Sequence, residues 1–185
     1  MESVNVTKLW IERFVIGLRL CPFAHFSFYN GTICYDVSRS LQKEDCLNDL
    51  WDMIMKMKQT KQEEISNSFL LYHRSLSFDF MLGLKEEMDA LLVEKSLEKE
   101  FQTVVFHPDF QFGDETFHAS GNFTNRSPLP MIHILRVEEV ARAIDLTEDV
   151  EEIPFRNKRV LENLKIKNIA EVFDDDFMEK IKPYI

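Results

Sequence analysis

Apolar residues recur along the chain with two different periods, which predict helices and strands in alternation. Residues 4–20 carry one stripe of large apolar side chains spaced four positions apart, and this spacing predicts a helix. Pro22 ends that helix, because the residue before a proline is pushed out of the helical region of backbone conformation. The residues of the stripe are Val6, Trp10, Phe14 and Leu18.

Four short segments rich in β-branched and aromatic residues predict strands. They are residues 32–37, 69–73, 102–107 and 131–136. Longer segments with helical periodicity separate the first three strands, and Ser40 and Ser77 are suited to cap these two helices. Another helix is expected at residues 137–146, with short helical pieces at 156–164 and 177–182.

These elements predict an α/β fold of the α+β kind, with a small mixed four-stranded sheet. Their order is strand, helix, strand, helix, strand, loop, strand, helix, with an extra N-terminal helix and a helical C-terminal tail. Helical crossovers favour parallel strands, whereas the loop between the third and fourth strands allows these two to be antiparallel neighbours. We expect residues 1–165 to form a single domain, with residues 166–185 a helical appendage that is not an independent domain.

Composition and charge exclude several classes of function. Apolar residues make up 45% of the 185-residue chain, and its 16 Phe indicate a core rich in large aromatic side chains. The formal net charge is −10, and the densest basic run, at Arg156, Lys158 and Arg159, is short. Nucleic-acid binding needs a basic stripe that neutralises phosphates, and an acidic protein is repelled by anionic membranes. We therefore expect neither nucleic acid nor a membrane as partner.

Composition also bears on location. No stretch reaches the roughly 18 apolar residues that a membrane helix needs, and charged residues interrupt the N-terminal apolar pattern, unlike a signal peptide. The cysteines Cys21, Cys34 and Cys46 are too few and too irregularly spaced for a disulfide framework or a structural zinc site. These features predict a soluble protein of the cytoplasm.

His107 ends the third predicted strand, and Asp109 follows two residues later. Ligands bind at the carboxyl ends of strands in open α/β sheets, and a histidine beside a carboxylate is suited to proton transfer. The alternative is a structural turn, in which Pro108 fixes the backbone and Asp109 forms hydrogen bonds with it. Both interpretations stay open.

A long loop, residues 108–130, precedes the fourth strand, and loops of this length are usually functional or disordered. It contains Asn125, Arg126 and Ser127. The planar guanidinium of Arg126 is suited to a carboxylate or phosphate, and its neighbours add polar contacts. We count Arg136 as a further ligand-binding candidate. The alternative is that Arg126 clamps the loop through backbone carbonyls or Asp109.

Cys21 and His133 are the remaining candidates for catalysis. Cys21 follows the C-terminus of a predicted helix, whose partial negative charge disfavours a thiolate, so a reactive thiol there needs a nearby cation. Its alternative role is that of a small buried apolar residue. His133 lies between Ile132 and Ile134, where a histidine of the core is equally possible.

Three segments, in the same order, resemble an uncharacterised family of bacterial proteins known as domain of unknown function 1415. Residues 9–24 end in Cys21-Pro22-Phe23-Ala24, residues 106–112 begin with Phe106-His107-Pro108-Asp109, and residues 125–136 begin with Asn125-Arg126-Ser127-Pro128. The resemblance covers roughly residues 8–165 and implies a shared fold but no activity. The chain departs from the family pattern at Phe155, where an acidic residue is expected between Pro154 and Arg156.

Our leading hypothesis is an intracellular protein that binds or transforms a small anionic metabolite. In it, Arg126 holds the anion, His107 and Asp109 move a proton, and Cys21 or His133 completes the pocket. One alternative is an iron or zinc site, because His107, Asp109 and His133 match the ligands of two-histidine-one-carboxylate centres. Another is a non-enzymatic interaction protein with its Phe-rich loop as the partner surface. Both an enzyme and a binding protein fit these residues, and no cofactor or oligomeric state follows from them.

Overall fold

A computed structural model of the chain describes residues 2–147 and 149–184. It contains the mixed four-stranded sheet that the sequence predicts, in the order β1-β2-β4-β3. β1 and β2 are parallel, and β4 runs antiparallel to both β2 and β3. The strands are β1 (Ile33–Val37), β2 (Asn67–Leu71), β3 (Phe101–Phe106) and β4 (Met131–Arg136).

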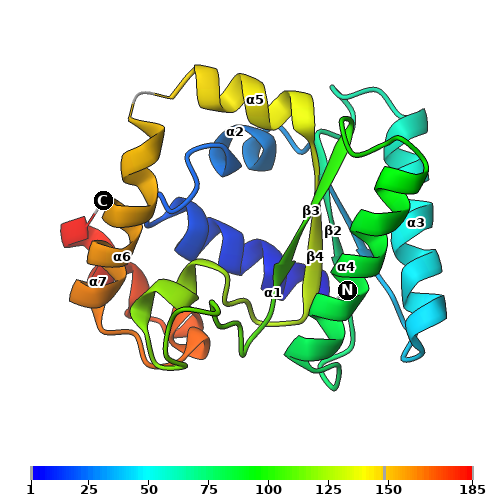
Figure 1. The fold of residues 1–185 in the computed structure, drawn as a ribbon. Helices are drawn as coiled ribbons and strands as arrows, with labels where there is room; N and C mark the ends of the chain where they lie inside the picture. Colours follow the sequence, from blue (N-terminus) through cyan, green and yellow to red (C-terminus); the bar gives the residue numbers. More distant parts are fainter. Residues whose placement is uncertain (1, 148, 185) are drawn as a thin grey trace.

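One face of the sheet packs against two long helices, α3 (Lys43–Gln59) and α4 (Phe78–Glu94) (Figure 1). Ser77 caps α4 as the sequence predicts, since its side chain accepts a hydrogen bond from the Phe80 amide. The proposed cap at Ser40 is wrong. α3 begins after Gln42, and the Ser40 hydroxyl instead donates to Oδ2 of Asp49.

The opposite face of the sheet packs against helical elements from both ends of the chain (Figure 1). The C-terminal tail belongs to this core, because Ile169, Val172, Phe177 and Ile181 are all buried in it. The elements over this face are α1 (Glu2–Trp10), the π-helix η1 (Ile11–Ile16), α6 (Ile153–Leu164), η4 (Ile169–Phe173) and α7 (Phe177–Ile181).

The first predicted helix changes its winding after Trp10, where α1 gives way to the π-helix η1. A spacing of four residues exceeds the 3.6 residues of an α-helical turn, and the wider turn keeps Trp10, Phe14 and Leu18 in one core. Gly17 ends this segment at a crowded position. A Cβ atom there would lie 2.1 Å from the carbonyl oxygen of Arg13 and 3.0 Å from Cδ1 of Ile181.

Two smaller helices, α5 (Val137–Asp145) and α2 (Ala24–Tyr29), complete the helical layer on the α1 side of the sheet. α5 follows β4 directly and matches the prediction closely. α2 is a helix that the sequence pattern does not predict, because none of its six residues is buried and so no apolar period marks it. Within the described residues, no helix is both long and apolar enough to cross a membrane.

Candidate functional site

His107 is held by backbone groups on the α3–α4 side of the sheet. Its ring is 3% exposed, and Nδ1 accepts a hydrogen bond from the Asp109 amide at 3.0 Å. That leaves the proton on Nε2, which donates to the carbonyl oxygen of Leu76 at 2.9 Å. The Asp109 carboxylate is 4.0 Å from Nδ1 and points mostly into solvent. Both nitrogens of His107 are therefore engaged in holding the chain.

Arg126 lies inside the long loop and holds other parts of that loop in place through hydrogen bonds. Its Nε donates to the carbonyl oxygen of Phe110 at 3.2 Å, and its Nη2 donates to that of Phe117 at 2.5 Å. The guanidinium also lies between the rings of Phe117 and Phe123, 4.5 and 4.6 Å from their centroids. Burial lowers the pKa of Arg126, and nearby Asp109 opposes this shift. The side chain is 5% exposed, so most of its donors face protein.

The neighbours of Arg126 are used in the same way. The Asn125 side-chain amide donates to the carbonyl oxygen of Val105 at 3.2 Å, and the Ser127 hydroxyl donates to that of Leu129 at 2.6 Å. Asn122 adds to this set, because it accepts from the Phe112 amide and donates to two carbonyls of the loop. These contacts explain how a long loop stays ordered.

Arg136 lies away from this loop, at the far end of β4. Its guanidinium donates to the carbonyl oxygens of Met57, in the last turn of α3, and of Thr60 and Ile65, which follow that helix. Burial lowers the pKa of Arg136, while surrounding glutamates oppose the shift. Arg136 thus joins the end of α3 to the sheet.

Cys21 lies in the turn between η1 and α2. Burial raises the pKa of its thiol, and hydrogen bonds from the backbone amides of Phe23 and Ala24 partly offset that effect. Two side chains of α6 fix the preceding turn: Arg156 donates to the carbonyl oxygens of Leu18 and Arg19, and Asn157 donates to that of Leu20 at 2.7 Å. The chain segment that carries Phe155, at the departure from the family pattern, therefore contacts the segment that carries Cys21.

His133 lies on the opposite face of the sheet from His107. It packs against Phe69 and Phe106 on the α1 side, whereas His107 contacts Phe78 of α4. The two histidines and Asp109 therefore do not converge on one ion. In the part of the chain that the structure describes, no three His, Cys, Asp or Glu side chains are arranged to hold a metal.

His133 belongs to an aromatic cluster that contains one residue from α1 and one from each of the four strands. We define this aromatic cluster as Trp10, Tyr35, Phe69, Phe106 and His133. The His133 ring is stacked on Phe69 with a centroid distance of 3.9 Å, and Phe69 lies 5.9 Å from Tyr35 and 6.2 Å from Phe106. Trp10 contacts Phe106 edge to face at 5.5 Å. The five rings thus form one continuous group.

The aromatic cluster contains polar atoms without hydrogen-bond partners. Trp10 Nε1 and the Tyr35 hydroxyl are buried and unpartnered among the described residues. His133 uses one nitrogen only. The Asn67 side chain donates to Ser66, so its Oδ1 accepts from Nε2 of His133 at 2.9 Å. Nδ1 then carries a lone pair with no partner within the described chain, in a side chain that is only partly buried.

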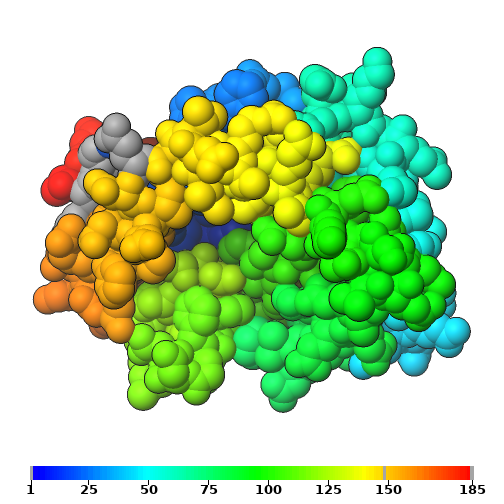
Figure 2. Space-filling model, turned by 45° about the horizontal axis from the view of Figure 1, so that its top comes forward, coloured from blue at the N-terminus to red at the C-terminus, as the bar shows by residue number. Residues whose placement is uncertain are grey.

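A hollow in the surface opens over the N-terminal helical segment, which carries Trp10 (Figure 2). It opens between α5, α6, β3 and the loop that contains η2 (Ser120–Thr124), and the dark blue of α1 and η1 is visible at its bottom. On the same face of β3 and β4 as His133, several side chains stay partly exposed. They are Gln102, Val104, Phe106 and Leu135.

α5 borders the hollow and keeps its apolar side chains accessible. None of its nine residues is buried. Val137 and Val140 are half-buried, and Ile144 is 44% exposed. An amphipathic helix normally buries such a stripe against the core, so α5 leaves apolar surface available beside the hollow.

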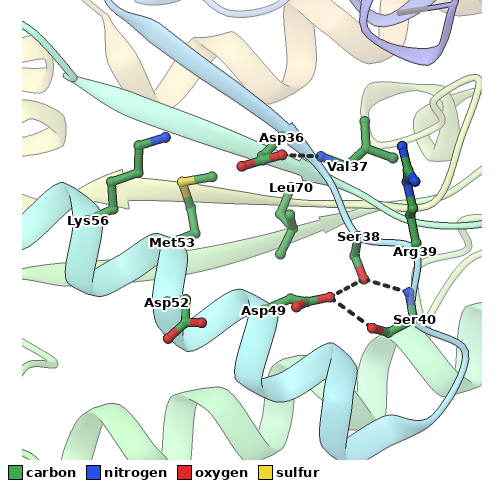
Figure 3. A pocket seen from close by; sticks show the side chains of 10 residues that line it. All are labelled: Asp36, Val37, Ser38, Arg39, Ser40, Asp49, Asp52, Met53, Lys56 and Leu70. Atoms are coloured by element: carbon green, nitrogen blue, oxygen red, sulfur yellow. Dashed lines mark hydrogen bonds between the residues drawn. The ribbon is translucent and has the colours of Figure 1, made fainter.

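A second cavity, of about 370 Å³, lies beyond the C-terminal end of β1 (Figure 3). Two of its three carboxylates, Asp36 and Asp49, form hydrogen bonds within the lining. Asp49 accepts from the hydroxyls of Ser38 and Ser40, and Asp36 accepts from the Val37 amide. These contacts order the turn between β1 and α3, and the aromatic cluster remains the stronger candidate site.

Reasoning from the sequence found His133 but not its surroundings. The sequence pattern counts Trp10 only as part of the apolar stripe of the first helix. The available signal was the alternation within the fourth strand, which puts His133 on one face with Met131 and Leu135. Which aromatic residues meet that face depends on sheet order, which the sequence does not give.

The chain belongs to the family described as a protein of unknown function (DUF1415), whose model matches residues 2–171. The resemblance inferred from its three motifs is thereby confirmed. Neither a curated protein nor a solved structure matches the chain.

Proposed function

We propose that the protein binds a small molecule in the hollow above the aromatic cluster, in the reducing cytoplasm of a bacterial cell. One observation carries this proposal: Trp10 Nε1 and His133 Nδ1 lack hydrogen-bond partners in one aromatic cluster, and the N-terminal segment that carries Trp10 forms the bottom of a surface hollow. The three free cysteines agree with a reducing compartment.

Unpartnered polar atoms are costly in a folded protein. A buried donor or acceptor without a partner costs about 1–3 kcal/mol, and most such groups in native proteins are satisfied by protein, water or ligand. The indole of Trp10 is 1% exposed and the ring contacts Phe106, which is itself partly exposed. Because Nε1 is buried, a bound molecule with polar groups above Phe106 would offset that cost only if the indole ring turns toward the hollow.

The surroundings have the composition of a ligand site. Small-molecule pockets are mostly apolar and aromatic, with a few convergent polar groups that set orientation. Val104, Phe106 and Leu135 supply partly exposed apolar surface, and His133 supplies a polar group. The apolar stripe of α5 supplies a further wall that a ligand would cover.

Binding is favoured over catalysis at this site. Burial lowers the pKa of His133 to about 3, so its imidazole is a weak base and stays neutral near pH 7. Our earlier expectation, an anion held by Arg126 beside His107, stays a prediction, as do the metal-site and interaction alternatives. The side chains of His107 and Arg126 are engaged with backbone groups, which makes the hollow the better-supported site.

The test is to place a charge in the hollow. Val104→Lys introduces an ammonium group beside the aromatic cluster, while Val93→Lys introduces the same group on the exposed outer side of α4. Both variants and the wild type would be screened against a fragment library by ligand-observed NMR. We expect fragments to bind the wild type and Val93→Lys, and to lose binding to Val104→Lys. Equal binding by all three proteins would refute the proposed site.

A further inference from the structure

We infer that the ligand of this hollow is an uncharged, largely apolar ring compound that donates a hydrogen bond to Nδ1 of His133. This inference rests on the proposed function and adds the chemical class of the ligand. It follows from three properties of the site: the tautomer of His133, the charges around it and the aromatic surface beside it.

The tautomer of His133 is fixed by its neighbour Asn67. Because the Asn67 amide group donates to the Ser66 hydroxyl at 3.0 Å, its oxygen faces the imidazole and can only accept. His133 must therefore donate from Nε2 and present the lone pair of Nδ1. A ligand that meets this nitrogen has to bring an N–H or O–H group.

The aromatic cluster itself contains no charged side chain. Burial is the cause of the lowered pKa of His133, and no charged side chain contributes to it. The ammonium of exposed Lys8 lies over the ring of Tyr35 at 5.1 Å, on the side of the edge strand β1. An ionised ligand would lose its hydration here without a counter-charge, which is costly.

The shape of the surface favours a flat apolar body. Cross-strand pairing puts Val104 beside His133 on the other side from Phe69, and Phe106 lies next to Val104 on the same face of β3. Phe106 lies 6.2 Å from His133 and 5.5 Å from Trp10, measured between ring centroids. A ring compound over Phe106 would thus lie beside the rings of both His133 and Trp10.

Three naphthalene probes with one ring system test the ligand class. 2-Naphthol is uncharged at pH 7 and donates a hydrogen bond, 2-methoxynaphthalene has no donor, and 2-naphthoate is an anion. Dissociation constants would come from NMR titrations that follow the indole N–H signal of Trp10 and the ¹⁵N signals of His133. We expect 2-naphthol to bind about five- to tenfold more tightly than 2-methoxynaphthalene, the effect of one net hydrogen bond, and 2-naphthoate to bind most weakly. The Nδ1 signal should shift with 2-naphthol alone.

The variant His133→Phe keeps a ring at this position and removes the acceptor. It should bind 2-naphthol and 2-methoxynaphthalene equally, and the comparison among the three probes on wild-type protein does not depend on this variant folding. Tightest binding of 2-naphthoate, or equal binding of the two neutral probes to the wild type, would overturn the ligand class and leave the proposed function standing. If none of the three shifts the Trp10 signal at millimolar concentration, both the proposed function and the ligand class fail.

Discussion

His133 lies flat on Phe69, with the two rings 3.9 Å apart between centroids and inclined by only 7°. The two residues are direct partners across β4 and β2, so the sheet register itself sets this contact. The stacked pair buries most of an imidazole in apolar surroundings and leaves Asn67 as its one hydrogen-bond partner within the described chain. The protonation of His133 is therefore linked to folding.

We predict that His133 makes the protein less stable as the pH falls from neutrality. Its pKa is lowered from 6.5 to about 3 in the folded state. Between these values the unfolded chain binds a proton at this site and the folded chain does not, so stability is lost as pH falls below 6.5. The loss is at most about 1.4 kcal/mol per pH unit. Urea unfolding of wild type and His133→Phe between pH 7 and 4 measures it.

The free energy of unfolding of the wild type minus that of His133→Phe should fall as the pH falls, because the variant lacks the titrating group. His118→Gln serves as the control, since it removes a histidine at an exposed position. An NMR titration gives a direct check. A His133 midpoint near 6.5 in the folded protein would contradict the prediction.

The fold was predictable where one local rule determined the outcome. β4 was predicted with its observed ends because alternating apolar residues are bounded by Pro130 and by the helix that begins at Val137. The cap at Ser77 followed from its position before an apolar helix. The α2 helix and the order β1-β2-β4-β3 were not predicted, since a helix without buried residues leaves no period and strand order depends on long-range packing.

For the candidate site, too, the sequence predicted the residues but not their contacts. The motif residues His107 and Arg126 were identified because histidine and arginine carry chemistry, but a sequence does not show which carbonyl oxygens they meet. Their partners Leu76 and Phe110 lie 31 and 16 residues away along the chain. The unpartnered indole of Trp10 could not be foreseen either, because an absent hydrogen bond becomes visible only after all neighbours are in place.

Arg126 should be required for stability through its shape as well as its charge. Arg126→Lys keeps the positive charge but removes the fork that reaches Phe110 and Phe117. With two hydrogen bonds lost and a cation moved from between two rings, we expect a loss of about 2–4 kcal/mol in the free energy of unfolding. Urea denaturation is the measurement. Arg74→Lys, at an exposed residue, should change stability by less than about 0.5 kcal/mol, and an equal effect of both substitutions would argue against the clamp.

Gly17 should tolerate no side chain. In Gly17→Ala the new methyl group would overlap the backbone carbonyl of Arg13, 2.1 Å away, and press on Ile181. Backbone cannot yield as a flexible side chain can, so we expect a loss of about 2 kcal/mol or more. Gly113→Ala provides the matched control because a Cβ atom there meets nothing within 4 Å. Thermal unfolding that is unchanged in Gly17→Ala would show that the π-helical end of this segment relaxes freely.

The reactivity of Cys21 should depend on the clamp that α6 places on the preceding turn. Because burial raises the pKa of the thiol, little thiolate is present at pH 7, and N-ethylmaleimide should modify Cys21 more slowly than it modifies glutathione. Asn157→Ala removes the hydrogen bond to Leu20, and Arg156→Gln weakens the hold on Leu18. Both variants should increase the rate of modification several-fold, as measured by peptide mass spectrometry. Cys46, which is fully buried, is the internal control, and its rate should stay low unless the whole protein unfolds. An unchanged Cys21 rate in both variants would mean that burial of the thiol does not depend on α6.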